Sequence, residues 1–265
     1  MNNKERLIKL LVDKDINLDI NSKWFKIFSQ NIYILEEVFK KLDLEEKKGY
    51  EICPSIDQVF EAFEDLKYDK IRIVIIGEDP YPDINNAVGK SFCYPKNQEI
   101  PKSAKAIKNS LEDFLDFNIS DNKFQNFLES ISKNSCLMFN MALTIGLSNN
   151  KEKTNSRHFK IWEDFFKMII NEINKKENVK FIPLGCTPGD ALDKVVNNDN
   201  ADIYRVYHPA IRFPNQATRE NYILFKDANI FEVINNHFKE KYNKKINIES
   251  FKEEEINIIN KNYKK

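Results

Sequence analysis

The chain alternates between two kinds of hydrophobic pattern. In the first, apolar residues recur every three or four positions, which places them on one face of a helix. This pattern runs through residues 1–50 and returns in several later segments. In the second, short runs are almost wholly apolar and rich in β-branched residues, as in IRIVII at 71–76. Such runs are typical of strands that are buried on both faces of a sheet.

The predicted helices and strands alternate along the chain. After the helical segment 1–50, Ser55 is expected to cap an amphipathic helix that follows Pro54. Strands are expected at 71–76, 135–145, 178–185 and 202–210, and further helices at 103–115, 121–133, 162–175 and 219–241. Strands separated by helices predict an α/β protein with an open, mostly parallel sheet.

Length and charge restrict what this α/β protein can be. The 265 residues suit one domain, which we expect over 1–250 with a charged tail at 251–265. The 41 basic and 41 acidic residues give a net charge of +0. A chain-wide field that attracts a polyanion is therefore not available. Any nucleic acid must instead be held by a local basic surface on a neutral body.

The four cysteines and the lengths of the apolar runs indicate the cellular compartment of the protein. The cysteines are scattered and form no C-x-x-C pair. Cys53, Cys93 and Cys136 lie among apolar or strand-like neighbours, which favours buried free thiols at these three positions over ligands or disulfides. The first residues, MNNKERLIKLLVDKD, lack the apolar core of a signal peptide, and no later run approaches membrane-spanning length. We therefore expect a cytoplasmic protein without a membrane partner.

Polar residues gather at the ends of the predicted strands. In open parallel sheets, ligands bind beyond the carboxyl ends of the strands. Those positions hold Glu78, Asp79 and Tyr81 after the first strand, Asn140 near the end of the second, Gly185 and Cys186 after the third, and His208 after the fourth. Four strand ends thus supply acid, amide, tight turn and histidine, and this convergence predicts a ligand site.

Each of these residues also has an ordinary explanation. Asp79 suits a turn or a helix cap, His208 suits a turn, and aromatic residues such as Tyr81 and Phe92 suit the core. Asn140 is harder to explain in this way, because an unpaired buried amide costs about 1–3 kcal/mol. Its ordinary explanation is a hydrogen bond to a loop backbone. Nucleotide-binding, metal-binding and G-x-S-x-G motifs are missing from the sequence, so no cofactor and no metal are expected.

Taken together, the motifs resemble those of the uracil-DNA glycosylase family. GEDPYP at 77–82 resembles the family's water-activating motif GQDPYH, and the spacing is kept onward to GKSF at 89–92. LMFNMALTI (137–145) is similar to the family's LLLNxxLTV, HFKIWEDF (158–165) to its H-x-x-x-W-E segment, and VYHPAIRF (206–213) to its HPSPLS loop. The resemblance covers roughly residues 22–250. It implies a three-layer α/β/α fold around a central, mostly parallel four-stranded sheet.

The resemblance also implies a role for each matching position. Asp79 would orient the attacking water and stabilise positive charge on the deoxyribose, while His208 would donate a hydrogen bond to O2 of the leaving base. Tyr81 would exclude the 5-methyl group of thymine, Phe92 would stack on the extruded base, and Asn140 would bind its polar edge. DNA contacts would come from Pro101, Ser103, Gly185, Cys186, Ala210, Ile211 and Arg212.

The activity implied is hydrolysis of the N-glycosidic bond of uracil in DNA after base flipping, as in base-excision repair. Because no lysine is expected within the site motifs, a monofunctional enzyme without a Schiff base is expected. The implied partners are single- or double-stranded DNA and a proteinaceous glycosylase inhibitor. We expect the protein to be a monomer.

Several positions depart from the family pattern. Glu78, at a substrate-binding position, stands where the family has glutamine; Pro82 replaces histidine, Cys186 serine and Arg212 the wedge leucine, and DINNAVG (83–89) replaces GPGQAHG. The catalytic groups are kept while the DNA-handling surface is altered. Two alternatives therefore stay open. One is the same mechanism on a modified pyrimidine in foreign DNA, and the other is a weakly active or inactive DNA-binding or partner-docking subunit.

Overall fold

A four-stranded sheet forms the centre of the protein. The computed structural model describes residues 1–148, 150, 154–196, 201–211 and 219–245. The strands lie in the order β3 (Cys136–Asn140), β2 (Ile73–Gly77), β6 (Lys180–Pro183), β7 (Asp202–Ile203). Each neighbouring pair is parallel, so the carboxyl ends of the strands meet at one edge. The α/β class with a central parallel four-stranded sheet is confirmed.

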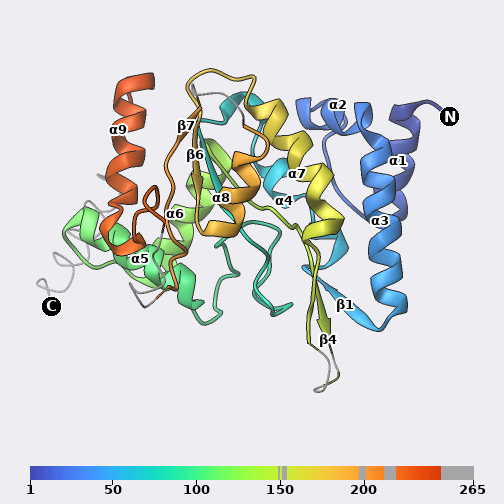
Figure 1. Cartoon of the computed structure of the whole chain (residues 1–265), viewed down its shortest axis with the longest axis horizontal. Coiled ribbons are helices and arrows are strands. Elements are labelled where there is room, and N and C mark those ends of the chain that lie inside the picture. Colours follow the sequence, from blue (N-terminus) through green and yellow to red (C-terminus); the bar gives the residue numbers. More distant parts are fainter. Residues whose placement is uncertain (149, 151–153, 197–200, 212–218, 246–265) are drawn as a thin grey trace, which may run out of the picture.

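Helices cover both faces of this sheet (Figure 1). Side chains of a strand point alternately to its two faces, and in β2 Val74 and Ile76 face one core while Ile73 and Ile75 face the other. The first core lies against α1 (Asn3–Asp13), α2 (Lys23–Gln30), α3 (Ile32–Lys47), α4 (Glu61–Asp65), α7 (Phe159–Ile173) and α8 (Cys186–Asp193). The second lies against α5 (Lys102–Leu115), α6 (Asp121–Asn134) and α9 (Ile230–Tyr242). The result is three layers.

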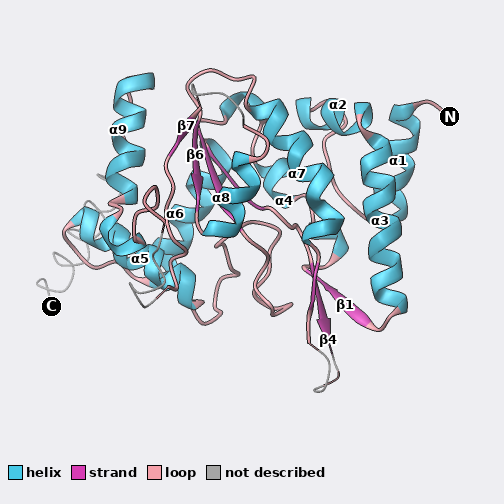
Figure 2. Ribbon diagram, viewed as in Figure 1, coloured by secondary structure: helices cyan, strands magenta, loops and turns pink. Residues whose placement is uncertain are grey.

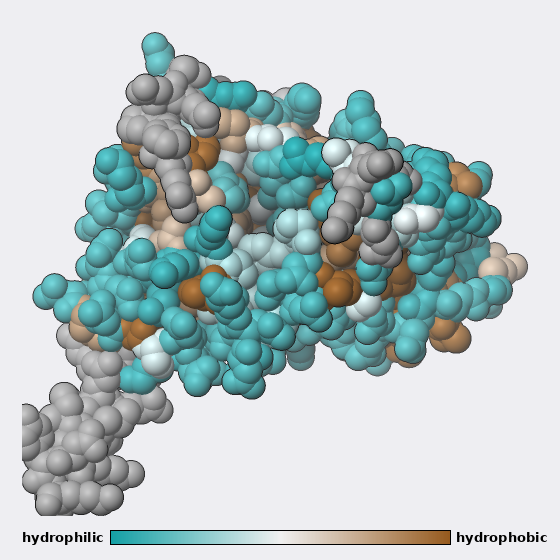
Figure 3. Space-filling view, turned by 90° about the horizontal axis from the view of Figure 1, so that it is seen from below, coloured by the Kyte–Doolittle hydropathy of each residue, from teal (hydrophilic) through white to brown (hydrophobic). Residues whose placement is uncertain are grey.

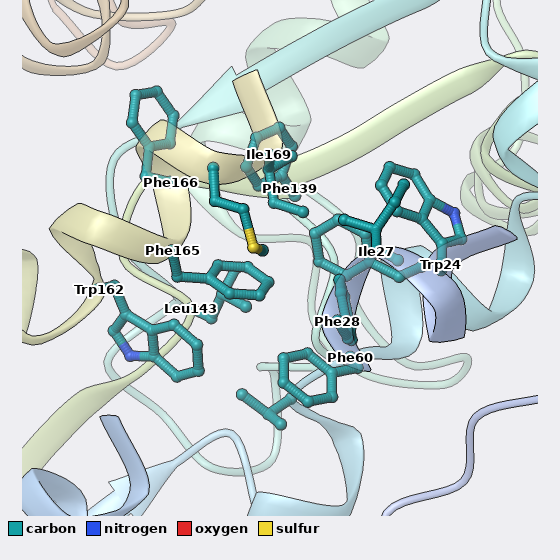
Figure 4. Packing of buried hydrophobic residues seen from close by; sticks show 14 of the residues in the cluster. Trp24, Ile27, Phe28, Phe60, Phe139, Leu143, Trp162, Phe165, Phe166 and Ile169 are labelled. Atoms are coloured by element: carbon teal, nitrogen blue, oxygen red, sulfur yellow. The ribbon is translucent and has the colours of Figure 1, made fainter. Parts of the chain in front are cut away.

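An aromatic cluster joins the N-terminal helices to the sheet (Figure 4). Phe28 of α2 packs on Phe60 with ring centroids 5.0 Å apart, and Phe60 stacks on Phe165 of α7 at 5.7 Å. The indole of Trp24 is fully buried and donates a hydrogen bond of 2.8 Å to the carbonyl of Leu66. Residues 1–50 therefore share one core with the central sheet.

A second, antiparallel sheet lies beside the central sheet and was not predicted (Figure 2). It contains β1 (Tyr50–Cys53), β4 (Ile145–Ser148) and β5 (Ser156–Arg157) in the order β1-β4-β5. The prediction of one strand over 135–145 was wrong, because β3 ends at Asn140 and the chain turns before β4. That turn is buried and apolar, with Ala142 and Leu143 in the core, so hydropathy does not reveal it.

Three further predictions were wrong in their extent. The helix expected after Pro54 is divided into a 3₁₀ turn (Ile56–Gln58) and α4, and Ser55 makes no side-chain capping bond. The fourth strand covers only 202–203, and α9 begins at Ile230 instead of at residue 219. Tertiary pairing explains the last difference, since Ile223 forms a bridge with Val206 and residues 219–229 are thereby kept out of the helix.

Two further expectations concern the C-terminal tail and membrane-spanning segments. The predicted tail at 251–265 lies outside the described residues. None of the described helices is long and apolar enough to cross a membrane.

Candidate active site

A cavity of about 290 Å³ opens at the edge where the carboxyl ends of the parallel strands meet. Figure 3 looks at this side of the molecule, which is mostly hydrophilic with small apolar areas. The lining residues are Glu78, Asp79, Pro80, Tyr81, Pro82, Ala87, Val88, Gly89, Lys90, Phe92, Ser103, Asn140 and His208. The cavity therefore brings together all five residues to which the resemblance assigns a role in binding or transforming a base.

The loop after β2 is held rigidly against the end of β3. The backbone N–H groups of Met141 and Ala142 donate to the carbonyls of Gly77 and Glu78, at 2.9 and 3.1 Å. Pro80 and Pro82 then fix the backbone on either side of Tyr81, because the proline ring locks φ. The acidic pair and the tyrosine are thus positioned by backbone bonds and prolines.

The carboxylate of Asp79 is bound by Arg157 of β5. Two guanidinium nitrogens of Arg157, Nε and Nη2, lie 3.2 and 2.9 Å from Oδ2 of Asp79. The same Nη2 also donates to Oε1 of Glu78. The sequence reasoning missed Arg157. No motif marks it, and only the unpredicted pairing of β4 with β5 brings it within reach of the acids.

Tyr81 is a fixed wall of the cavity. Its hydroxyl donates to the carbonyl of Phe92 at 3.3 Å and accepts from Oγ of Ser103 at 3.2 Å. Burial raises the pKa of Tyr81, so the ring remains a neutral phenol at pH 7. Ser103, expected among the DNA contacts, is buried, and its hydroxyl points to Tyr81.

Phe92 holds a backbone conformation that is rare for a bulky residue. Its φ of 62° lies in the left-handed region. Its ring is buried and lies 6.2 Å from the ring of His208, at an interplanar angle of 42°. Conformations of this kind persist where the surrounding structure enforces them, and they are frequent at ligand sites.

Asn140 ends β3 directly opposite Gly77 of β2. The side chain is 7% exposed, and its amide makes no hydrogen bond to any of the described residues. The ordinary explanation, a bond to a loop backbone, is therefore not what the structure shows. A buried amide without a protein partner is available to a ligand in the cavity.

Gly77 makes room for this amide. A Cβ atom added at Gly77 would lie 2.1 Å from Oδ1 of Asn140 and 3.1 Å from Cβ of Ser91. We expect Gly77→Ala to displace the amide of Asn140 and to lower activity about 10- to 100-fold, the range that a misplacement of about 1 Å produces. Steady-state kinetics and thermal unfolding check this together. Unchanged activity in a folded variant would mean that the position of Asn140 does not matter.

The protonation of His208 is set by its own loop. The backbone N–H of Ala210 donates to Nδ1 of His208 at 3.2 Å, so the proton of the neutral ring is on Nε2. Burial lowers the pKa of His208, and the negative charges of Glu78 and Asp79 oppose this effect only in part. At pH 7 the ring is therefore neutral, with Nε2–H as its donor.

Lys90 of GKSF (89–92) also lines the cavity, so the expectation that no lysine occupies the site motifs was wrong. Its ammonium group forms an ion pair with Asp65, and both side chains are largely buried, with 11% and 15% exposed. An ammonium group held in an ion pair has no lone pair to offer, so it is a poor nucleophile. Among the described residues, no group of three or more histidine, cysteine or acidic side chains could hold a metal ion.

Of the expected DNA contacts that the structure describes, Ser103 lines the cavity and the others do not. Gly185, with a φ of 129°, precedes α8, and Cys186 is the first residue of that helix. Burial raises the pKa of the Cys186 thiol, so it is not a thiolate at pH 7. Pro101 directly precedes α5. Ala210 lies two residues after His208 and donates its backbone N–H to Nδ1 of that ring. Ile211 lines a neighbouring cavity that His208 also borders. Arg212 lies outside the described residues.

The cavity can stabilise two opposite charges at once. The Asp79 carboxylate offers a fixed negative charge, and the Nε2–H of His208 offers a hydrogen-bond donor on another wall. Preorganised groups of this kind stabilise charge that develops in a transition state. Breaking an N-glycosidic bond produces such a pair of charges, positive on the sugar and negative on the base.

Comparison with known proteins agrees with this chemistry. Residues 63–239 match the family model "Uracil DNA glycosylase superfamily". A uracil-DNA glycosylase of Clostridium perfringens (strain SM101 / Type A) is 30% identical over 180 residues, which are 68% of this chain and 76% of the relative. That of Bacillus cereus (strain AH820) is 28% identical over 178 residues, or 66% and 76%.

Solved structures show the same fold. The crystal structure of mimivirus uracil-DNA glycosylase has a TM-score of 0.73 and 24% identity, covering 90% of this chain and 91% of that one. A variant of mimivirus UNG in complex with UGI has a TM-score of 0.73 and 25% identity, covering 90% and 93%. With its cavity, its strand-end motifs and a family match across most of its length, this chain belongs to the uracil DNA glycosylase superfamily.

Proposed function

We propose that this DNA glycosylase excises uracil from DNA by hydrolysis and leaves an abasic site. One observation carries the proposal: Asp79 and His208 line the same cavity as Asn140, whose amide makes no hydrogen bond to the residues that the structure describes. These are the three groups that the reaction needs, namely an anion for the sugar, a donor for the leaving base and a polar reader of the base edge.

In the proposed reaction, the bond between N1 of uracil and C1′ of the deoxyribose breaks, and its electron pair stays on the base. The resulting anion is delocalised toward O2, where the Nε2–H of His208 stabilises it. Asp79 stabilises the positive charge on the sugar and orients the water that attacks C1′. The water oxygen becomes the hydroxyl on C1′, its released proton balances the uracil anion, and free uracil departs.

Uracil is preferred in this proposal because of the walls of the cavity. The amide of Asn140 would accept from N3–H and donate to O4, and Tyr81 would fill the space beside carbon five. An amide side chain can present its donor and acceptor in either orientation, so Asn140 alone does not select uracil over a modified cytosine. Tyr81 would select against bulk at carbon five, because its ring lines the cavity and the prolines on either side fix its backbone.

Tyr81→Ala is therefore expected to release thymine, which the native protein leaves in place. Removing the ring opens the space that a 5-methyl group requires, while Asp79 and His208 are unchanged. Tyr81→Phe is the matched control, since it keeps the ring and removes only the hydroxyl; it should still exclude thymine. Release of thymine from oligonucleotides is measured for the alanine and the phenylalanine variants. If Tyr81→Ala gained no activity on thymine, the tyrosine would be a packing residue only.

The proposal is tested by incubating the pure protein with single- and double-stranded oligonucleotides that carry uracil, thymine or modified cytosines, and by scoring abasic sites. We expect release of uracil in the presence of a metal chelator, with no adduct trapped by borohydride, because Lys90 is held by Asp65. Preferential release of a modified pyrimidine would replace uracil as the substrate. Abasic sites in none of the substrates would refute glycosylase activity.

The expected partners follow from this function. DNA is the substrate, and the complex of a mimivirus UNG variant with UGI leads us to propose that an inhibitor of the same kind binds this chain. Such an inhibitor would have to cover the face on which the cavity opens. Loss of uracil release on addition of UGI would support its binding, and full activity at saturating UGI would exclude it.

A further inference from the structure

The loop at the cavity carries one more negative charge than the proposed chemistry uses. Glu78 and Asp79 are adjacent in the sequence, and both line the cavity. Two carboxylates so close together repel each other. They also face the site at which a polyanionic strand must bind and an anionic base must leave. Glu78 would therefore hinder the reaction unless a cation offset its charge.

Arg157 provides this cation. Its Nη2 donates to both acids, and its Nε donates to Oδ2 of Asp79. A planar guanidinium can bind two carboxylates in this way, whereas the ammonium of a lysine is a single point charge. The group also stacks on the ring of Phe159, 4.5 Å from its centroid. The acids and the arginine together have a net charge of −1, as a single carboxylate would.

The bond to Asp79 leaves one of its oxygens free. Both hydrogen bonds from Arg157 are made to Oδ2. Within the described part of the chain, no hydrogen bond is made to Oδ1. Arg157 can therefore hold the carboxylate in one orientation while Oδ1 accepts a hydrogen bond from the attacking water.

The strand that carries Arg157 is anchored on both sides. Ser156 donates to Oε2 of Glu45 on α3 at 2.6 Å, and Nδ1 of His158 lies 2.8 Å from Oγ1 of Thr144. The backbone of Arg157 itself is in register with Ile145 of β4. Both of its neighbours in the sequence are thus fixed to buried groups, which positions the backbone of Arg157. Its side chain is 54% exposed, and the guanidinium is held by Glu78, Asp79 and the ring of Phe159.

We propose that Arg157 is a positioning residue that neutralises Glu78 and fixes the carboxylate of Asp79 for hydrolysis. The proposal rests on the function proposed above for Asp79. In this arrangement Glu78 and Arg157 depend on each other, because the negative charge of Glu78 would hinder the reaction if Arg157 did not offset it. Removing Arg157 leaves two unneutralised carboxylates at the cavity, and removing the charge of Glu78 as well relieves that repulsion.

A double-mutant cycle with wild type, Arg157→Gln, Glu78→Gln and the double variant tests this pair. On an oligonucleotide containing uracil, we expect Arg157→Gln to lower kcat about 10- to 100-fold and to weaken DNA binding. In the double variant we expect most of the loss in DNA binding to be restored and the loss in kcat to be restored only in part, because no guanidinium then holds the carboxylate of Asp79. Arg157→Lys should fall between wild type and Arg157→Gln, because it keeps the charge and loses the fork.

Arg6→Gln is the matched control. Arg6 binds Glu36 through the same two nitrogens, Nε and Nη2, on the N-terminal helices, and neither residue lines the cavity. It should leave kcat and DNA binding unchanged. Thermal unfolding of every variant shows whether a loss reflects unfolding.

Two outcomes would overturn the proposal: full activity in Arg157→Gln, or a loss in DNA binding that Glu78→Gln does not restore. Failure of the proposed function would look different, since wild type would then release no uracil at all. In that case the same four proteins are compared by fluorescence anisotropy with the uncleaved oligonucleotide. Weaker binding of Arg157→Gln that Glu78→Gln restores would support the pair, and absence of this coupling, or of binding, would refute it.

Discussion

Replacing Asp79 by asparagine is expected to slow uracil release by about 1000-fold. The substitution keeps the size and shape of the side chain and removes its negative charge. The deoxyribose would then develop its positive charge without a fixed anion beside it. The remaining donor groups of the cavity would still bind the base, so the loss should appear in the rate of bond cleavage more than in DNA affinity. Single-turnover formation of abasic sites measures that rate.

Asp43→Asn is the matched control for this loss of charge. Asp43 forms an ion pair with Lys14 between α3 and the end of α1, at 2.6 Å, and does not line the cavity. Its substitution should leave cleavage unchanged. Equal activity of Asp79→Asn and wild type would mean that the carboxylate has no part in the reaction.

His208→Ala is expected to slow release by about 100- to 1000-fold, the typical effect of removing one preorganised donor. The leaving base would carry its negative charge without the Nε2–H at O2. His208→Gln offers an amide N–H in a similar place and should lose less than the alanine variant. The measurement is again single-turnover cleavage of an oligonucleotide containing uracil. If the alanine variant cleaved at the native rate, the base would be stabilised elsewhere.

The two losses are not expected to add. Residues that act on one transition state as a unit show non-additive effects, because removing one leaves the other with less charge separation to stabilise. An Asp79→Asn, His208→Ala variant should therefore be only slightly slower than Asp79→Asn alone.

Most of the central sheet could be predicted because its strands are buried on both faces. The run 71–76 and the apolar part of 135–145 became β2 and β3 with shifts of a few residues. The antiparallel sheet was missed because hydropathy does not mark its strands. Its strands are short, and the turn between β3 and β4 is as apolar as the strands that it joins. Residues 219–229 of the helix expected from residue 219 were lost to tertiary pairing of Ile223 with Val206.

The site was predictable where the topology alone brings residues together. Parallel strands place their carboxyl ends at one edge, so the order of strands and helices is enough to group Asp79, Asn140 and His208. Arg157 could not be grouped with them, because it arrives from an antiparallel strand of two residues. Lys90 shows a similar limit: it follows the strand-end loop closely in the sequence, while its ion pair with Asp65 depends on the packing of distant segments.

The most direct measurement is a crystal structure of Asp79→Asn bound to an oligonucleotide that contains 2′-fluoro-2′-deoxyuridine, whose fluorine disfavours positive charge on the sugar and so keeps the glycosidic bond intact. We expect an extruded uracil in the cavity, with O2 about 3 Å from Nε2 of His208, the amide of Asn140 at N3 and O4, and C1′ facing residue 79. A uracil that stayed stacked in the DNA, or that bound with His208 and residue 79 on the same side of the glycosidic bond, would contradict the account.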